Sequence, residues 1–377
     1  MSILIGADIV PTQSNIDLFK AGDIESLLGS GLIECLNNAD YRIFNIEAPI
    51  TDIHEPIPKC GLNLQVPSAC IKGLSAMRID LVTLANNHIL DQGEKGLFDT
   101  QKHLEEEGIN HVGTGTNTNA ARKPFVFLHN GKKIGVFACA EHEFSIATNN
   151  SAGANPFDSL ESPDDVYRLK QECDYVIVLY HGGKEFYRYP SPFLQKTCRK
   201  LIEKGANLVI CQHSHCIGCE EHYNNGIIIY GQGNFIFDSG SDEYWNSGIL
   251  VSIDESFEIQ YYPIVKNGNG VRLANEYEKT ELMTEFYERS KQALDPQFVN
   301  EKYARFAKEK VFSYLHACAP ADSVFIKLIN KLTRGKYQES RLRRQFNRYN
   351  AARVLNYIEC EAHQELFLRG LKDLIDE

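Results

Sequence analysis

The sequence predicts an α/β fold, because short β-branched runs alternate with amphipathic helical stretches from the start of the chain to about residue 264. The early strands are separated by helices, which is typical of parallel sheets, whereas the last strands follow one another as antiparallel hairpins. We therefore expect two packed mixed sheets with helices outside. Beyond about residue 275 the pattern changes to long helices, which predicts a first domain over residues 1–270 and an α-helical region over 271–377.

Each element follows from its local pattern. Buried β-branched runs predict strands at residues 3–9, 41–46, 81–84, 125–129, 133–140, 175–180, 207–211, 226–230, 248–253 and 257–265. Apolar residues at helical spacing predict helices at residues 24–37, 68–77, 96–107, 163–172 and 192–204. Asn130-Gly131 separates two of the strands and predicts a tight hairpin turn.

Composition excludes several classes of protein. The formal net charge is −11, which argues against nucleic-acid binding, because affinity for a phosphate backbone requires a cationic face. The first residues have the pattern of a strand rather than a signal peptide, and no apolar run approaches the ~20 residues that span a bilayer. The eleven cysteines lack framework spacing, so we expect free thiols and a cytoplasmic protein.

The stretch 81–91 gives the first sign of a functional site. Its first half predicts a buried strand, and Asn86, Asn87 and His88 follow where that strand ends. Buried polar groups need partners, so we expect these residues in a cleft at the carboxyl end of a sheet, where open α/β folds bind ligands. Asn87 offers a carbonyl oxygen, and His88 offers a nitrogen ligand or a proton donor. A turn with a helix cap is the alternative interpretation.

Potential metal ligands recur at the ends of five predicted strands. They are two carboxylates, an amide and three imidazoles, from Asp8, Glu47, Asn87, His181, His213 and His215. This mixed oxygen and nitrogen set suits Mn, Fe or Zn, and six ligands are enough for two divalent ions that share a carboxylate. His213 and His215 would point to opposite faces of an extended strand, so they converge only where the backbone turns.

Two other patterns have both a functional and a purely structural interpretation. Cys216 and Cys219 have the spacing of a structural zinc site, but no second thiol pair accompanies them, so packing is the preferred interpretation. Residues 331–353 carry eight Lys or Arg against one acid, Glu339. These helices could contact a membrane surface, an anionic polymer or a polymer-synthesis complex, although a solvated helix face is the more common explanation.

Six motifs, taken in order, resemble those of one known family. They are NIEAPIT at 45–51, LANNHILD at 84–91, GTG at 113–115, HGGKE at 181–185, ICQHSH at 210–215 and YGQGNFIFD at 230–238. Together they resemble the CapA family of capsule or poly-γ-glutamate synthesis proteins, which are related to calcineurin-like metallophosphoesterases. The resemblance covers residues 3–265. It implies a four-layer α/β/β/α sandwich with a metal site between the carboxyl ends of its two sheets.

The resemblance also implies which residues hold each ion. One ion would use Asp8, Glu47 and His215. The other would use Glu47, Asn87, His181 and His213. The chain has Val10 where general metallophosphoesterases have a histidine, so the first ion would lack one nitrogen ligand.

Further residues are expected around the ions. In the family His88 matches the histidine that protonates a leaving group, and Asp91 would fix its tautomer, unless it only caps a helix. Lys184 and Glu185 either recognise a charged substrate or form an exposed loop pair. The remaining residues expected to bind substrate are Asn45, Gln212 and Asn234.

These observations predict a metal-dependent hydrolase of capsule or surface-polymer biosynthesis. Water activated by one or two ions would attack a phosphoester or a γ-glutamyl amide of a small molecule or an anionic polymer. The alternative is a non-catalytic, metal-containing assembly partner in polymer synthesis or export. Val10 favours this alternative modestly, and the complete set of Asn87, His88 and the three histidine ligands argues against it.

Overall fold

The computed structural model describes residues 2–237, 243–317, 324–359, 363–364, 367–368 and 370–371. The chain divides into two compact units, Met1–Asn300 and Glu301–Glu377. The first unit extends past the boundary near residue 270 that the sequence suggested, because helix α8 (Glu276–Ala293) packs against its strands. Phe286 of α8 is fully buried, and its ring lies 5.2 Å from that of Tyr261.

The larger sheet is mixed and has eight strands, in the order β16-β15-β14-β1-β2-β3-β4, with β13 also paired to β1. Their bounds are β1 Ser2–Val10, β2 Tyr41–Ile46, β3 Leu81–Thr83, β4 Asn110–Val112, β13 Asn234–Phe237, β14 Ser247–Asp254, β15 Ile259–Asn267 and β16 Gly270–Leu273. Strands β1 to β4 and β13 are parallel, whereas β14 to β16 are antiparallel additions. The predicted pairing of the last two long strands is confirmed.

The smaller sheet has six strands, in the order β11-β12-β10-β9-β7-β6. Their bounds are β6 Phe125–His129, β7 Lys132–Ala140, β9 Tyr175–His181, β10 Leu208–Gln212, β11 Glu220–Tyr223 and β12 Gly226–Tyr230. The inner strands are parallel, and each edge strand is antiparallel to its neighbour. Asn130 and Gly131 both have positive φ in the turn between β6 and β7, which confirms the predicted hairpin.

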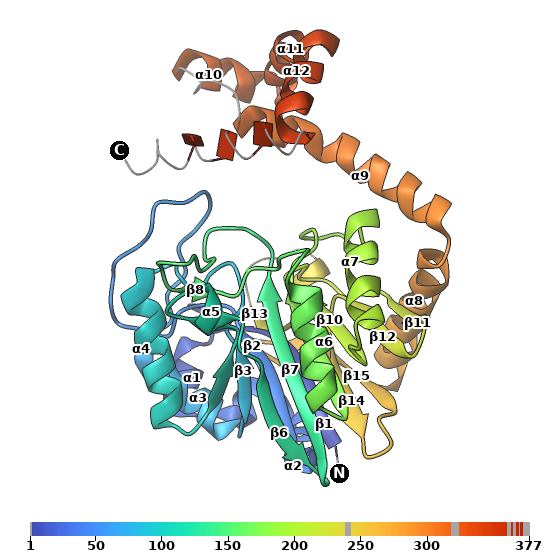
Figure 1. Cartoon of the computed structure of the whole chain (residues 1–377). Helices are drawn as coiled ribbons and strands as arrows, with labels where there is room; N and C mark the ends of the chain where they lie inside the picture. Colours follow the sequence, from blue (N-terminus) through green and yellow to red (C-terminus); the bar gives the residue numbers. More distant parts are fainter. Residues whose placement is uncertain are drawn as a thin grey trace. The chain divides into compact units, whose positions relative to one another are not determined.

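Apolar side chains from both sheets form the central core, so the sheets pack face to face. Figure 1 shows helices on the outer sides of this pair. Helices α1 (Ile16–Ala21), α2 (Ile24–Asn38), α3 (Ile71–Ala76) and α4 (Gly93–Glu106) share a core with the larger sheet. Helices α6 (Ser162–Glu172) and α7 (Pro192–Glu203) share a core with the smaller sheet. The first unit is therefore the expected four-layer α/β/β/α sandwich.

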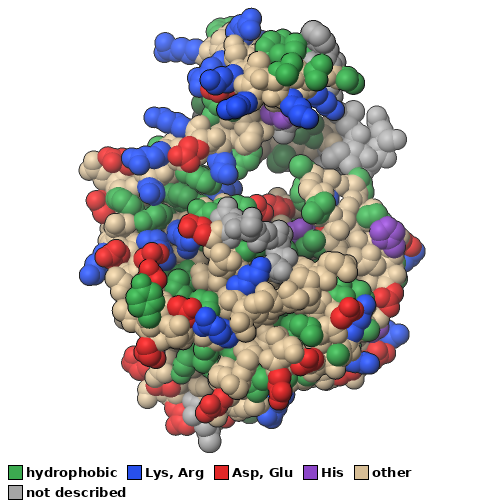
Figure 2. Space-filling view, turned by 180° about the vertical axis from the view of Figure 1, so that it is seen from behind, with side chains coloured by type: hydrophobic (Ala, Val, Ile, Leu, Met, Phe, Trp, Pro, Cys, Tyr) green, Lys and Arg blue, Asp and Glu red, His purple; other side chains and the backbone are tan. Residues whose placement is uncertain are grey.

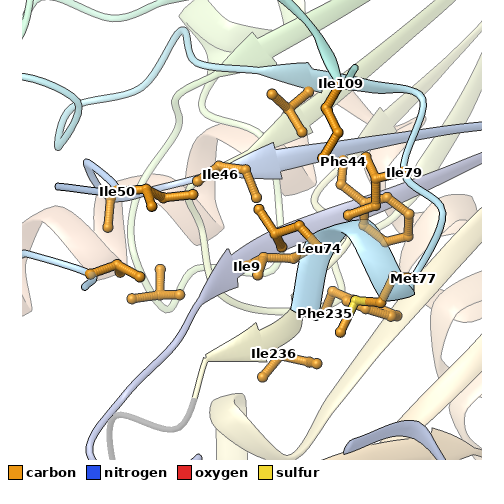
Figure 3. Close-up of a cluster of buried hydrophobic side chains, with 14 of the residues drawn as sticks. Ile9, Phe44, Ile46, Ile50, Leu74, Met77, Ile79, Ile109, Phe235 and Ile236 are labelled. Carbon is orange, nitrogen blue, oxygen red and sulfur yellow. The ribbon is translucent and has the colours of Figure 1, made fainter. Parts of the chain in front are cut away.

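The outer core of the larger sheet shows how a helix is held on its strands (Figure 3). Leu74 of α3 lies beside Ile9 of β1, the adjacent Met77 lies beside Phe235 of β13, and all four side chains are almost fully buried. Burial of each such side chain contributes about 1.5–3 kcal/mol. This packing fixes the strands whose carboxyl ends carry the predicted ligands.

Short elements complete the first unit. They are a 3-10 turn before α3, η1 (Ser68–Cys70), the helix α5 (Thr118–Ala121), the paired strands β5 (Thr114–Gly115) and β8 (Gly153–Ala154), and the 3-10 turn η2 (Glu243–Asn246). Gly113 precedes β5 with a φ of 86°, and a Cβ there would lie 2.6 Å from Ala85 Cβ and 2.9 Å from Ala138 Cβ. The glycine motif at 113–115 therefore allows close approach of the backbone between the two sheets.

The second unit is helical in its described parts. It holds most of α9 (Pro296–Ala317), followed by α10 (Val324–Leu332), α11 (Lys336–Gln345) and α12 (Arg348–Glu359). Helices α10 and α11 are in contact, and Leu342 of α11 is buried. Within the described ranges, no helix is both long and apolar enough to cross a membrane.

Candidate metal centre

An irregularity in β1 places the first ligand. The strand register shifts around Asp8, which lies opposite Asn45 of β2 on one side and Asn234 of β13 on the other. Asp8 is fully buried, and its Oδ1 accepts a hydrogen bond of 2.7 Å from Asn45 Nδ2. The sequence placed Asp8 at the end of its strand. In the structure the strand continues to Val10, and the irregularity takes the place of a strand end.

The backbone turns immediately after β10, as convergence of the two histidines requires. His213 has a φ of 87° and His215 a φ of 54°, both in the left-handed region. Such residues store about 1–3 kcal/mol of strain each, which is common at functional sites. The ring centroids of His213 and His215 lie 6.0 Å apart, and that of His181 lies 5.0 Å from His213.

Five buried side chains form what we call the ligand cluster: Asp8, Glu47, His181, His213 and His215. Within it, two groups of three residues each bring potential ligand atoms within 4.8 Å of one another. One group is Glu47, His181 and His213, and the other is Asp8, Glu47 and His215. Glu47 belongs to both groups. This is the arrangement expected of a bridging carboxylate between two ions.

Asn87 adds an amide oxygen to the first group. Its Oδ1 lies 3.0 Å from His181 Nε2, which in turn lies 3.2 Å from Glu47 Oε1. Asn87 Nδ2 donates a hydrogen bond of 2.8 Å to Glu143 Oε2, so the amide is oriented with its oxygen toward the cluster. The structure thus brings together all six residues that the sequence singled out as ligands.

The cluster lacks the positive charge that its carboxylates require. Neither carboxylate oxygen of Glu47 has a hydrogen-bond partner among the described residues, and His213 Nδ1 also has none. Burial raises the pKa of Asp8 and of Glu47 to about 8, and the charge of Glu47 raises that of Asp8 further. Burial also lowers the pKa of His181 and of His215 to about 4. Neutral imidazoles beside buried carboxylates fit one or two divalent ions.

A second layer of amide side chains orients the ligands. Asn45 Nδ2 contacts both Asp8 and, at 3.4 Å, His181 Nδ1, while Asn86 Nδ2 donates to Asn45 Oδ1 at 3.2 Å. Asn45 is fully buried. Its contacts are those of a residue that positions ligands, rather than the substrate contact that the sequence suggested.

Beside the ligands lies a second set of charged residues, the proton-donor cluster of Lys59, His88 and Asp91. His88 Nδ1 lies 2.6 Å from Asp91 Oδ2, as predicted. Asp91 also accepts hydrogen bonds from the Leu64 backbone N–H at 2.6 Å and from Lys59 Nζ. Lys59 Nζ lies 3.1 Å from His88 Nδ1, and its side chain is only 2% exposed. Every charged group of this cluster therefore has a partner.

The other residues expected to bind substrate occupy two kinds of position. Lys184 and Glu185 are exposed. The charge of Lys184 lowers the pKa of His213, and the charge of Glu185 raises the pKa of Glu47. Gln212 is buried, and its Nε2 donates to the Gly6 carbonyl oxygen at 3.2 Å, so it links the two sheets. Of the five residues expected to bind substrate, only Lys184 and Glu185 are exposed to solvent.

Asn234 orients one of the histidine ligands. Its Oδ1 lies 2.9 Å from His215 Nδ1, and its own Nδ2 is buried without a partner among the described residues. Asp238, the last residue of that sequence motif, lies outside the described part of the chain.

An aromatic wall borders His215. The Trp245 ring stacks on His215 at a centroid distance of 4.8 Å, and Phe237 lies 5.4 Å from His215 and 5.0 Å from Trp245. Phe186, in the loop after β9, is tilted against the same histidine at 6.0 Å. Trp245 is the single tryptophan of the chain. Its fluorescence therefore reports on the site.

Two residues of the site were missed in the sequence. Glu143 follows β7, so the rule that found the other strand-end ligands, applied to residues 141–143, would have indicated it. Lys59 lies in a long loop without any pattern and is far from His88 in sequence. Neither group of potential ligands among the described residues includes Cys216 or Cys219, and both are buried free thiols.

The chain is similar in sequence to several curated proteins. Curated relatives include "Capsule biosynthesis protein CapA" of Bacillus anthracis, 29% identical over 54% of this chain and 52% of the relative. "PGA biosynthesis protein CapA" of Bacillus subtilis (strain 168) is 28% identical over 62% of this chain and 60% of the relative. The chain thus matches little more than half the length of either relative.

Solved structures with a related arrangement are more distant. A novel phosphatase of Mycoplasma pneumoniae is 15% identical, with a TM-score of 0.42 over 74% of this chain and 96% of that one. A 5'-nucleotidase precursor of Thermus thermophilus is 14% identical, with a TM-score of 0.37 over 82% of this chain and 59% of that one.

The family itself is established by a direct match. The model of the family described as "Bacterial capsule synthesis protein PGA_cap" matches residues 2–239, which is more than half of the chain and contains every residue of the ligand cluster. The resemblance to CapA proteins inferred from the six motifs is confirmed. The chain is a member of the PGA_cap family of bacterial capsule synthesis proteins.

Proposed function

We propose that this protein is a metal-dependent hydrolase of capsule or surface-polymer biosynthesis. The observation that carries the proposal is Glu47, a fully buried carboxylate that is shared by two groups of potential ligands and has no hydrogen-bond partner among the described residues. A buried anion of this kind is stable only beside a cation. Divalent ions held there would activate a water molecule and stabilise the negative charge that develops during hydrolysis.

Residues of the chain would bind the two ions and orient the ligands. Asp8, Glu47 and His215 would hold one ion, and Glu47, Asn87, His181 and His213 the other. Asn45 and Asn234 hold the ligands in place through the hydrogen bonds described above.

His88 is the proton donor to the leaving group. Asp91 Oδ2 accepts the hydrogen bond from His88 Nδ1, which leaves Nε2 to carry the proton that is transferred. The Asp91 carboxylate therefore fixes the orientation of the His88 ring. Lys59 keeps Asp91 in place.

Two bonds are candidates for hydrolysis. The names of the relatives refer to capsule and PGA biosynthesis, and a further relative from Mycobacterium tuberculosis, 26% identical over 64% of this chain and 66% of the relative, is a "Probable polyglutamine synthesis accessory protein". These names favour a γ-glutamyl amide in an anionic polymer. The two-ion arrangement favours a phosphoester. A cytoplasmic location is part of the proposal, and the nine described cysteines, all free thiols, support it.

The alternative is a metal-containing assembly partner without catalysis. Val10 occupies a position where general metallophosphoesterases have a ligand, and its side chain is buried. The group of Asp8, Glu47 and His215 then offers three ligands to its ion. The loss of one nitrogen ligand favours weak binding of that ion.

The test is a hydrolysis screen with phosphoester and γ-glutamyl substrates, carried out with Mn, Fe or Zn. We expect activity with one of these ions, and a 10²–10⁴-fold loss in His88→Gln with its metal content unchanged. His222→Gln is the matched control, because His222 is exposed on β11. If the metal-loaded protein hydrolyses neither class, the assembly role is correct instead. If His88→Gln retains full activity, as the control does, His88 is not the proton donor.

A further inference from the structure

The second unit presents a surface whose chemistry differs from that of the whole chain. Residues 324–358 contain nine Lys or Arg and one acidic residue, although the whole protein has a formal net charge of −11. Figure 2 shows Lys and Arg side chains beside exposed hydrophobic side chains in this unit, at the top of the view. The two kinds of side chain occur together on helix α10.

Helix α10 has an apolar stripe on its exposed side. Val324, Leu328 and Leu332 are four residues apart, so they lie on one face, and they are 84%, 56% and 76% exposed. Ile326 and Ile329 are half-buried on the other side of the helix. Asn330 bonds to Gln338 of α11 through both its amide nitrogen and its oxygen. These contacts fix the stripe on the side away from α11.

Basic residues flank this stripe. Lys327 and Lys331 each follow a stripe position by three residues, so they project beside it, and Arg334 comes after the helix. All three side chains are exposed, and none forms an ion pair with another described residue. In the first unit, by contrast, the exposed Lys95 and the half-buried Lys204 pair with Glu55 and Asp164.

We propose that the exposed face of α10 binds an anionic lipid surface as an interfacial amphipathic helix. A polyanion alone would be held by the basic residues and would leave Val324, Leu328 and Leu332 in water. A lipid surface provides both an apolar layer for the stripe and phosphate groups for the cations. This places the binding face in the second unit, and it requires neither the ligand cluster nor hydrolysis.

Co-sedimentation of the full chain with lipid vesicles tests this proposal. We expect binding to phosphatidylcholine vesicles that contain phosphatidylglycerol, no binding to phosphatidylcholine alone, and weakening as the salt concentration rises. Lys327→Gln with Lys331→Gln should weaken binding about 25-fold, at about fivefold for each lysine. Leu328→Ser with Leu332→Ser should weaken it at least tenfold, because the apolar contact is lost.

Matched variants in the first unit serve as controls. Leu160 is 81% exposed and Lys102 is also exposed, so Leu160→Ser and Lys102→Gln repeat the same chemistry elsewhere. We expect both to bind vesicles like the wild type. Equal weakening by the controls would overturn the proposal, as would wild-type protein that fails to bind anionic vesicles.

Two further outcomes would identify another occupant and also overturn the proposal. If soluble polyglutamate displaces the protein from vesicles and the leucine variant binds normally, the face binds an anionic polymer. If the protein dimerises without lipid and the leucine variant is monomeric, the face binds a second copy of the chain. All the substituted side chains are exposed, so circular dichroism should show unchanged folding.

Discussion

The ligand cluster and the proton-donor cluster lie beside each other and both bury charged groups, but they differ in whether residues of the chain balance those charges. In the proton-donor cluster, Asp91 accepts hydrogen bonds from Lys59, His88 and a backbone N–H. In the ligand cluster, neither carboxylate oxygen of Glu47 accepts a hydrogen bond from a described residue, although Oε1 lies 3.2 Å from His181 Nε2. The first is balanced by residues of the chain, whereas we propose that the second is balanced by bound cations. The predictions below test this difference, from the largest expected effect to the smallest.

The largest effect should come from Lys59. Lys59→Met leaves the Asp91 carboxylate buried without its cation, because the two side chains are 2% and 0% exposed. Loss of one partner of a buried ion pair costs about 3–5 kcal/mol, which urea denaturation will measure as a lower free energy of unfolding. Lys95→Met is the control, since Lys95 pairs with Glu55 at the surface and should cost at most about 1 kcal/mol. Equal effects of the two variants would mean that the proton-donor cluster does not depend on Lys59.

The pH dependence of stability should differ between metal-free wild type and Glu47→Gln. The pKa of Glu47 is raised from 4.5 to about 8, so the folded metal-free protein binds a proton more tightly than the unfolded chain. Wild type should therefore lose stability as pH rises from about 5 to about 8, by on the order of 2–4 kcal/mol. In Glu47→Gln this contribution is absent, so its stability should fall less over that range.

Thermal unfolding after chelation will measure this difference. Addition of Mn or Zn at pH 8 should reverse the order of stability, because wild type binds the ion and the variant loses the shared ligand. If the stability of wild type and variant has the same pH dependence without metal, ionisation of Glu47 does not destabilise the fold, which would contradict the prediction.

A smaller effect is expected from the residues that orient the ligands. Asn234→Ala removes the hydrogen bond to His215 Nδ1, and such changes lower metal affinity about 10–100-fold. Asn110→Ala is the control, because Asn110 is exposed on β4. Titration of the metal-free proteins with Zn, monitored by Trp245 fluorescence, will give both affinities. Unchanged affinity in Asn234→Ala would show that His215 needs no orienting partner or binds no metal.

Much of the fold could be predicted because several inner strands are buried on both faces. Strands β2 and β12 have the predicted bounds, and β9 differs by one residue. The short strands β4, β11, β13 and β16 were missed, since three or four residues show no period. Helix α1 was also missed, because it has only six residues. Pairing with neighbouring strands, rather than local preference, creates the short strands.

The site was predictable to a similar degree. The carboxyl ends of parallel strands bring their side chains to one edge, so Asp8, Glu47 and His181 could be grouped from the sequence alone. Lys59 could not be found, because its partner Asp91 is distant in sequence and the loop that carries Lys59 has no regular structure. Asn45 and Gln212 were expected to contact a substrate, because the sequence does not show their partners. In the structure Asn45 donates a hydrogen bond to Asp8, and Gln212 donates one to the Gly6 carbonyl oxygen.

Metal content by elemental analysis tests the central claim most directly. The protein should be purified without chelators, as wild type and as His181→Ala with His213→Ala, and compared with the exposed-site control His222→Ala. Wild type and control should each carry between one and two Mn, Fe or Zn ions per chain, and the double variant much less. Wild type that carries no metal and binds none on titration would contradict the account. The ligand cluster would then be a degenerate remnant in a protein that acts by binding or assembly.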